Sequence, residues 1–174
     1  DRATDGTITI DEQDISELKN KALDKFRAEK IGFIFQAFFV QANETCAQNV
    51  CLPLEIAGVP KSERKKLILE ALESVDLKDK LNEKAKNLSG GQKQRLAIAR
   101  AIVNKPSIIF ADEPTGNLDS ATGDRIEDLL FSFKKSFGTT LVIVTHDHDL
   151  AAKCDKQINL KDGRVVRGGT KWKL

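Results

Sequence analysis

The sequence predicts an α/β fold built on a parallel sheet. Residues 31–35 form a short apolar run, and residues 107–111 and 140–145 have the continuous apolar character of parallel strands that are covered on both faces. The segments between these runs space their apolar residues as helices do, and strands that alternate with helices imply a parallel sheet. Each of the three runs also ends in polar side chains.

The first thirty residues are expected to form a strand, a turn and a helix. Residues 7–10 alternate polar and apolar side chains, as a half-buried strand does, and acidic residues within 11–14 favour a turn. Ser16 can then cap a helix. The expected apolar face of that helix comprises Leu18, Ala22, Leu23 and Phe26.

Residues 37–60 lack a clear period and contain Pro53, Gly58 and Pro60, so we expect irregular structure there. Helical spacing follows this stretch, and residues 93–103 are apolar on most sides, as in a buried helix.

A later helix is expected after Ser120 and is stopped by Gly138. Its apolar face comprises Ile126, Leu129, Leu130, Phe133 and Phe137. A tight turn at Asp162-Gly163 then predicts a hairpin near the C-terminus.

Composition bears on three questions: whether the chain binds nucleic acid, whether it spans a membrane, and whether it is part of a longer protein. The 28 basic and 26 acidic residues leave a net charge of +2, so we expect no nucleic acid partner. No apolar run approaches the roughly 18–20 residues that a membrane-spanning helix needs. The chain begins at Asp1 and contains no Met, so we expect a fragment or a processed form of a longer protein.

The polar residues at the strand ends form the first candidate site. Gln36 follows the first run, Asp112 and Glu113 follow the second, and His146 follows the third. In open α/β sheets the ligand lies outside the carboxyl ends of the strands, so we expect these four residues to converge. Asp112 can hold Mg²⁺, usually through its water shell, while Glu113 can polarise an attacking water.

Plainer interpretations exist for two of these strand ends. The Asp-Glu-Pro sequence at 112–114 could be an ordinary turn, and His146 could be a structural residue at the end of a strand. The combination of three strand ends with complementary chemistry favours the functional interpretation.

A second candidate site is the sequence Leu-Ser-Gly-Gly-Gln at 88–92, just before the helix expected from Lys93. A hydroxyl and two glycines at a helix N-terminus can bind an anion, because bare N–H groups and the helix dipole point toward it. An ordinary serine cap is the alternative. It explains Ser89 but neither the two glycines nor Gln92.

These segments together resemble the motifs of ATP-binding-cassette (ABC) transporter ATPases. LSGGQ at 88–92 resembles the signature motif, and IIFADEPTGNLD at 108–119 resembles the Walker B strand, the catalytic Glu and the D-loop. VTHD at 144–147 resembles the switch-histidine loop, and IGFIFQ at 31–36 resembles the strand into the Q-loop. The match is closest to the lipoprotein-release and macrolide-export group of bacterial ABC ATPases.

The resemblance implies a P-loop NTPase (RecA-like) core with a helical subdomain. Residues 1–36 would be the N-terminal remnant of the core, 37–103 the helical subdomain with the signature, and 104–174 the core with Walker B, the D-loop and the switch His. It also implies a transport-coupled ATPase that works as a head-to-tail homodimer, with Mg²⁺ as cofactor and ATP as substrate.

In such a dimer, Ser89, Gly90 and Gly91 would contact the γ-phosphate of the ATP held by the partner, with Gln92 in the same motif. Asp119 of the D-loop would connect the two sites.

In each subunit, catalysis would rest on Glu113, His146 and Gln36, and Mg²⁺ on Asp112 and Gln36. Residues 37–60 would face an integral membrane permease, so the resemblance implies a cytoplasmic protein, peripheral on the inner face of the bacterial cell membrane. An ABC ATPase without a transport role and a degenerate structural remnant are the alternatives.

One family motif is missing from the sequence. GxxxxGK[ST], the Walker A loop, does not occur, and the resemblance places it upstream of Asp1. The nearest approach, residues 163–170, lacks the Lys and is expected to be a C-terminal loop.

The 174-residue chain alone should therefore show no ATPase activity and at best weak nucleotide binding. The reason is that phosphate binding in such sites depends mainly on the backbone N–H groups and the Lys of Walker A. Calorimetry with Mg-ATP measures the affinity. A micromolar dissociation constant would contradict this expectation and would mean that another segment cradles the phosphates.

Overall fold

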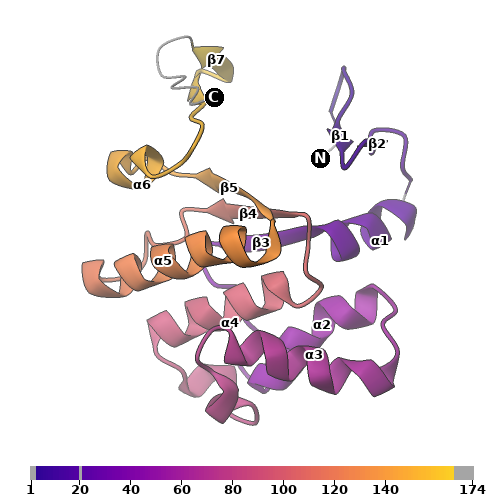
Figure 1. Cartoon of the computed structure of the whole chain (residues 1–174), viewed down its shortest axis with the longest axis vertical. Coiled ribbons are helices and arrows are strands. Elements are labelled where there is room, and N and C mark those ends of the chain that lie inside the picture. Colours follow the sequence, from indigo (N-terminus) through magenta and orange to yellow (C-terminus); the bar gives the residue numbers. More distant parts are fainter. Residues whose placement is uncertain (1–2, 20, 167–174) are drawn as a thin grey trace.

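A three-stranded parallel sheet forms the middle of the structure, a computed structural model that describes residues 3–19 and 21–166 (Figure 1). The strands lie in the order β3 (Ile31–Phe35), β4 (Ile108–Asp112) and β5 (Thr140–Val144). Phe35 pairs with Asp112, and Asp112 pairs with Val144, so all three strands end in one row. The predicted parallel α/β sheet is confirmed.

Helices cover one face of this sheet in two layers (Figure 1). In the inner layer, α4 (Gly90–Ile102) packs on β3 and α5 (Ser120–Phe137) packs on β5. In the outer layer, α2 (Cys46–Ile56) and α3 (Lys61–Glu73) both pack on α4. Helix α4 is thus enclosed on two sides, as predicted for residues 93–103.

The remaining elements are short. Helix α1 (Lys21–Lys30) leads directly into β3, and α6 (His148–Ala152) follows β5. Two single 3₁₀ turns, η1 (Lys78–Lys80) and η2 (Ala85–Asn87), connect α3 to α4. Antiparallel hairpins lie near the two ends of the described chain: β1 (Thr9–Ile10) with β2 (Gln13–Asp14), and β6 (Asn159–Lys161) with β7 (Arg164–Val166).

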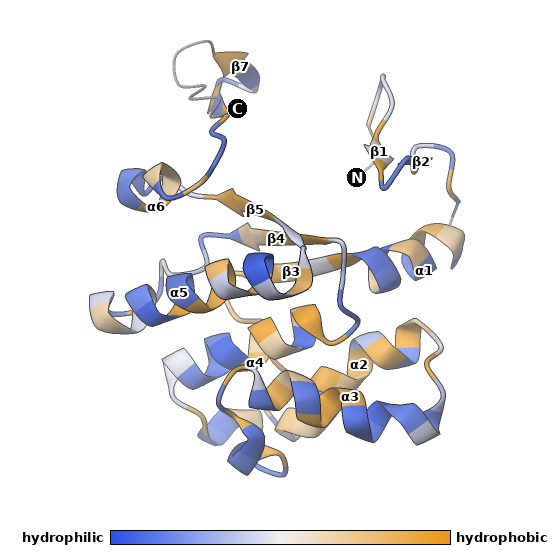
Figure 2. Ribbon diagram, viewed as in Figure 1, coloured by the Kyte–Doolittle hydropathy of each residue, from blue (hydrophilic) through white to orange (hydrophobic). Residues whose placement is uncertain are grey.

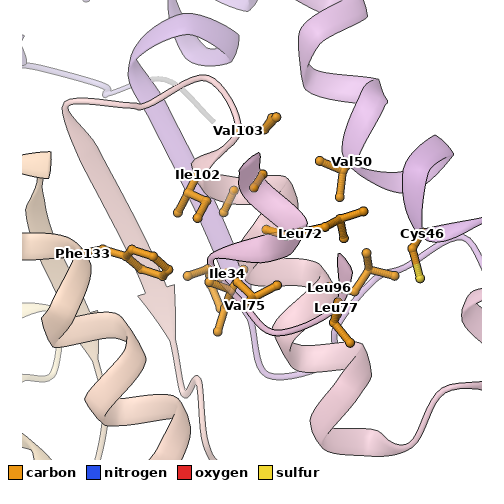
Figure 3. Close-up of a cluster of buried hydrophobic side chains, with 14 of the residues drawn as sticks. Ile34, Cys46, Val50, Leu72, Val75, Leu77, Leu96, Ile102, Val103 and Phe133 are labelled. Atoms are coloured by element: carbon orange, nitrogen blue, oxygen red, sulfur yellow. The ribbon is translucent and has the colours of Figure 1, made fainter. Parts of the chain in front are cut away.

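The main hydrophobic core lies where α2, α3 and α4 meet (Figure 3). Val50, Leu72 and Leu96 come from these three helices and are fully buried beside one another. Apolar residues of the three helices face inward, while polar residues of α3 face outward (Figure 2). Among the described residues, no helix is long and apolar enough to cross a bilayer.

The opposite face of the sheet is more open than the sequence predicts. Phe33 on β3 is 41% exposed and Val144 on β5 is 57% exposed, whereas Ile109 on the helix-covered face of β4 is 2% exposed. Strands covered on both faces were expected at 107–111 and 140–145. That expectation is wrong for 140–144, where the open face is exposed, and holds only in part for 108–111, where Ile108 and Phe110 are half-buried. The reason is that α4 and α5 both lie on one side of the sheet.

The N-terminal prediction also needs correction. The first strand begins at Thr9, and the turn is confined to Asp11 and Glu12, whose positive φ angles of 49° and 62° suit a two-residue hairpin loop. Gln13–Asp14 already forms the return strand β2.

Ser16 does not cap a helix. Its hydroxyl accepts a hydrogen bond from the backbone N–H of Ile8 at 2.8 Å, and α1 begins only at Lys21, so Leu18 lies outside the helix. Of the expected apolar face, Phe26 alone is buried.

The stretch 37–60 is not irregular throughout, because α2 lies within it. Thr45 caps this helix: its hydroxyl accepts the Gln48 N–H at 3.1 Å, and the Gln48 side chain accepts the Thr45 N–H at 2.8 Å. Pro53 lies inside the helix, although it lacks an N–H to continue the hydrogen-bond ladder. Burial of neighbouring side chains such as Leu54 outweighs this local cost.

The later elements agree with the sequence in most respects. Helix α5 buries Ile126, Leu130 and Phe133 of the predicted apolar face, leaves Leu129 partly buried, and is capped by Gly138, whose φ of 64° is left-handed. Phe137 was expected on the same face but is 46% exposed, because it is the last residue of the helix. The predicted hairpin at Asp162-Gly163 is present as β6 and β7. Only residues 163–166 of the expected loop at 163–170 belong to the described chain, and 167–170 lie outside it.

Replacement of Leu96 tests the enclosed position of α4. Leu96→Ala should lower the free energy of unfolding by about 2–5 kcal/mol, because it removes buried methyl groups and leaves a cavity. Leu96→Met keeps most of the volume and should cost less than about 1.5 kcal/mol. Urea unfolding of both variants measures the difference. Equal stability of the two would contradict a tightly packed core around α4.

Candidate functional site

The glutamate after β4 and the histidine after β5 are in direct contact. Glu113 Oε1 accepts a hydrogen bond from the backbone N–H of His146 at 2.8 Å and lies 2.7 Å from its ring Nδ1. Glu113 Oε2 accepts a hydrogen bond from the Thr145 hydroxyl at 3.1 Å. The loop after β5 therefore holds both carboxylate oxygens, while 87% of the His146 side chain remains exposed.

These contacts set the charge of Glu113. Burial raises the pKa of the Glu113 carboxyl, but hydrogen bonds from the side chain and backbone of His146 and from Thr145 outweigh it and lower the pKa below its ordinary value. The carboxylate is ionised at neutral pH, and an ionised carboxylate can accept a proton from a water molecule.

Glu113 also has a left-handed backbone, with φ of 43°. Such a conformation costs about 1–3 kcal/mol for a residue with a side chain, so its surroundings must hold it. The Glu113 N–H donates to the Val144 carbonyl at 2.9 Å, and the Glu113 carbonyl accepts from the Gly116 N–H at 3.1 Å. These bonds stabilise the sharp turn that brings Glu113 to the loop after β5.

Gln36 lies against another part of the loop after β4. Its backbone carbonyl accepts a hydrogen bond from Asn117 Nδ2 at 2.9 Å, and its Nε2 donates to Asn117 Oδ1 at 3.5 Å. A Cβ on Gly116 would lie 2.8 Å from Gln36 Nε2. The bare backbone of Gly116 therefore permits this close approach of the two loops.

Asp112 is the last residue of β4 and is exposed. It pairs with Phe35, so Gln36 is the next residue along the neighbouring strand. Magnesium in phosphate sites usually takes one or two protein oxygens besides phosphate and water, which fits Asp112 and Gln36. Across residues 3–19 and 21–166, no three His, Cys, Asp or Glu side chains form a metal-binding group.

The glycines of the Leu-Ser-Gly-Gly-Gln sequence lie inside a helix, because α4 begins at Gly90 and not at Lys93. Ser89 is the N-cap: its hydroxyl accepts the Gln92 N–H at 3.3 Å, and the Gln92 side chain accepts the Ser89 N–H at 2.9 Å. The serine cap is therefore real. It does not occupy the N–H groups of Gly90 and Gly91, which lie in the first turn, where helices bind anions.

The start of α4 also packs against the start of α5. A Cβ on Gly91 would lie 2.7 Å from Thr122 Cγ2, whereas a Cβ on Gly90 would meet Leu118 at an ordinary 4.0 Å. Gly91 therefore has a packing role within this chain, in addition to any role toward a phosphate.

Asp119 caps α5. One carboxylate oxygen accepts the Thr122 N–H at 3.0 Å, and the other accepts the Thr122 hydroxyl at 2.7 Å. The hydrogen bonds from the Thr122 side chain and backbone hold the pKa of Asp119 below its ordinary value. This local role is independent of the connection between sites that the resemblance implies, which stays a prediction.

The structure thus joins Glu113 to His146 and places Gln36 and Asp112 at the same edge of the sheet. Three further residues contact the site, Thr145, Asn117 and Thr122, and the sequence analysis assigned no role to any of them. Thr145 and Asn117 lie within the motif segments at 144–147 and 108–119, but their partners lie 32 and 81 positions away, so spacing alone does not reveal the contacts.

Parallel strands that end in this set of side chains, beside a glycine-rich helix start, define a nucleotide-binding α/β protein. The profile of the ABC transporter family matches residues 1–116, which is more than half of the chain. The chain belongs to the ABC transporter family.

Relatives of known sequence support the same assignment. The chain is 48% identical over 166 residues to the uncharacterized ABC transporter ATP-binding protein YvrO of Bacillus subtilis, covering 95% of this chain and 72% of that protein. It is 43% identical over 161 residues to the lipoprotein-releasing system ATP-binding protein LolD of Bacteroides fragilis, covering 92% and 74%. Relatives named for lipoprotein release and macrolide export confirm the predicted group.

A solved structure confirms the fold. The dimeric post-hydrolysis state of the ATP-binding cassette MJ0796, bound to ADP and Pi, superimposes with a TM-score of 0.85 at 42% identity. The match covers 98% of this chain and 75% of that chain. The predicted P-loop NTPase fold of an ABC ATPase is therefore confirmed.

The contact between Gly91 and Thr122 can be tested without nucleotide. Gly91→Ala should lower the free energy of unfolding by about 1–3 kcal/mol, because its methyl group would overlap Thr122 Cγ2. Thr122→Ser removes that methyl group and keeps the hydroxyl, so the double variant should recover most of the loss. Gly90→Ala is the matched control and should not destabilise. Additive losses in a double-mutant cycle of Gly91 and Thr122 would contradict the contact.

Proposed function

We propose that this chain works as the ATP-binding subunit of an ABC transporter, in which ATP binding and hydrolysis in a head-to-tail homodimer drive a membrane partner. The observation that carries the proposal is the Glu113 carboxylate, which is ionised, held on both oxygens and turned toward His146 at the carboxyl edge of a parallel sheet. The complete protein is accordingly an ATPase.

Each of the four residues at the strand ends has its own role in ATP hydrolysis. Glu113 polarises the attacking water, and His146 orients Glu113 through its backbone N–H and ring nitrogen. Asp112 and Gln36 would hold Mg²⁺ together with the phosphates, and the bound cation would neutralise charge that develops on the phosphoryl oxygens. Two observations support this assignment of roles: Asp112 is exposed, and Gln36 is held beside it by its hydrogen bonds with Asn117.

The signature serves the nucleotide of the partner subunit. Ser89, Gly90, Gly91 and Gln92 form an open helix end, and the first N–H groups of an α-helix have no partner inside the helix. Gly90 is exposed, so a phosphate from outside the chain can reach it. Asp119 follows on the adjacent α5 and would carry the connection between the two sites.

The membrane partner binds a groove of about 620 Å³ between α1, β3, α2 and α4. Ile56 lines it from α2, within residues 37–60, and is 56% exposed. Arg100 lines it from α4 and donates to the backbone carbonyls of Phe38 and Phe39 at 3.2 and 2.7 Å. An apolar groove with a guanidinium at its wall suits a short amphipathic segment of a permease subunit.

The location and the domain division follow from this partner. The protein would lie in the cytoplasm on the inner face of the bacterial cell membrane. Residues 1–36 and 104–174 would form the nucleotide-binding core, and residues 37–103, with α2, α3 and α4, would be the helical subdomain that meets the permease.

The test replaces Glu113 in a complete protein that includes a Walker A motif. Glu113→Gln should keep ATP binding but reduce hydrolysis by about 10²–10⁴-fold, because general-base assistance is worth about that much. ATP would then hold the two subunits together, and size-exclusion chromatography with Mg-ATP should show a persistent dimer.

Ser89→Arg supplies the second arm of this experiment. In the Glu113→Gln background, a bulky side chain at the signature should prevent the ATP-dependent dimer, since it blocks the partner's γ-phosphate. Wild-type turnover by Glu113→Gln would remove Glu113 from the mechanism. A stable ATP-bound dimer in the double variant would exclude the signature from the dimer interface.

A further inference from the structure

Gln94 is a polar side chain in the most enclosed part of α4. It is 0% exposed, and Leu96, Ala97 and Ile98 on the same helix are apolar and equally buried. Its amide oxygen has no hydrogen-bond partner among the described residues. A buried acceptor without a partner destabilises a fold, and an apolar side chain of similar size would avoid that cost. Core packing alone therefore does not explain Gln94.

The amide nitrogen of Gln94 indicates the role of this side chain. Its Nε2 donates a hydrogen bond to the backbone carbonyl of Pro114 at 2.5 Å. Pro114 directly follows Glu113, whose left-handed backbone needs external support. The hydrogen bond from Glu113 to Val144 anchors that turn to β5, and the bond between Glu113 and Gly116 closes it within the loop. The bond from Gln94 anchors the same turn to α4.

The same end of α4 carries the signature. Gly91 packs closely against Thr122, one helical turn before Gln94. The start of α4 therefore touches the segment from Pro114 to Thr122 at two places, through Gly91 and through Gln94, and the Gln94 bond lies nearer to Glu113 in the sequence. A shift of α4 would be transmitted to this segment through these contacts.

We propose that Gln94 is a positioning residue that ties the loop carrying Glu113 to the helix carrying the signature. The position of Glu113 in one ATP site then depends on how α4 of the same chain engages the nucleotide held by the partner subunit. This inference rests on the proposed function, since it takes Glu113 as the residue that polarises the water and residues 89–91 as the contact to the partner's ATP.

The experiment uses Gln94→Met in a complete protein that includes a Walker A motif. Met keeps the volume and removes both the hydrogen bond and the unpartnered oxygen. The urea unfolding midpoint should stay the same or rise. The kcat for ATP should fall about tenfold, as expected when the loss of one hydrogen bond leaves the loop that carries Glu113 less well positioned for the transition state. KM should stay within about twofold, because Gln94 is buried and does not reach the nucleotide.

Two further variants make the result specific. Lys93→Met, one residue earlier on α4, controls for the Met side chain and should keep the wild-type kcat. Gln94→Met combined with Glu113→Gln should still form the ATP-dependent dimer, since the signature is intact.

Each other outcome overturns the inference. If Gln94→Met keeps the wild-type kcat while Glu113→Gln loses hydrolysis, Gln94 does not position Glu113, and the proposed function is unaffected. A lower kcat that only matches a loss of folded protein shows a structural role. Loss of the ATP-dependent dimer shows that Gln94 acts on the signature itself. Full turnover by Glu113→Gln overturns both the inference and the proposed function.

Discussion

Three parallel strands end in one register row, in which Phe35 pairs with Asp112 and Asp112 pairs with Val144. The contacts between the loops that follow these strands depend on this register. Because the strands stop level with one another, the residues that follow them emerge at the same edge, and Glu113 reaches the loop after β5 across a single strand spacing. A register shift of one residue would turn the side chains of a strand to the opposite face and separate these groups.

The second constraint is the close packing of α4 between the sheet and the outer helices. A Cβ on Gly32 would lie 2.5 Å from the Ala101 carbonyl, so β3 and α4 approach each other as closely as their backbones allow. Such an interior transmits displacement instead of absorbing it. The first turns of α4, which carry the signature, are thus packed rigidly against the sheet, and the Gln94–Pro114 hydrogen bond links α4 directly to the loop after β4.

Several residues of the site combine a local and a chemical role. Ser89 caps α4, Asp119 caps α5, and Gly91 makes room for Thr122, yet all three belong to motifs that the family associates with nucleotide. The two roles are compatible because a cap uses only part of a helix end and leaves N–H groups open. Hydrogen bonds fix Ser89 and Asp119 in the folded chain, and in the proposed function the same bonds would hold both residues in position for a nucleotide.

The sequence by itself determined the parallel α/β class, the positions of all three sheet strands and the two candidate sites, because apolar period and strand-end chemistry are local signals. Tertiary structure alone decided the helix α2 around Pro53, the role of Ser16 in the first hairpin, and the one-sided cover of the sheet. It alone also decided the partners of Thr145, Asn117 and Gln94, which lie far from them in sequence. Such outcomes depend on burial and on contacts between distant segments, which outweigh local propensity and leave no periodic trace in the chain.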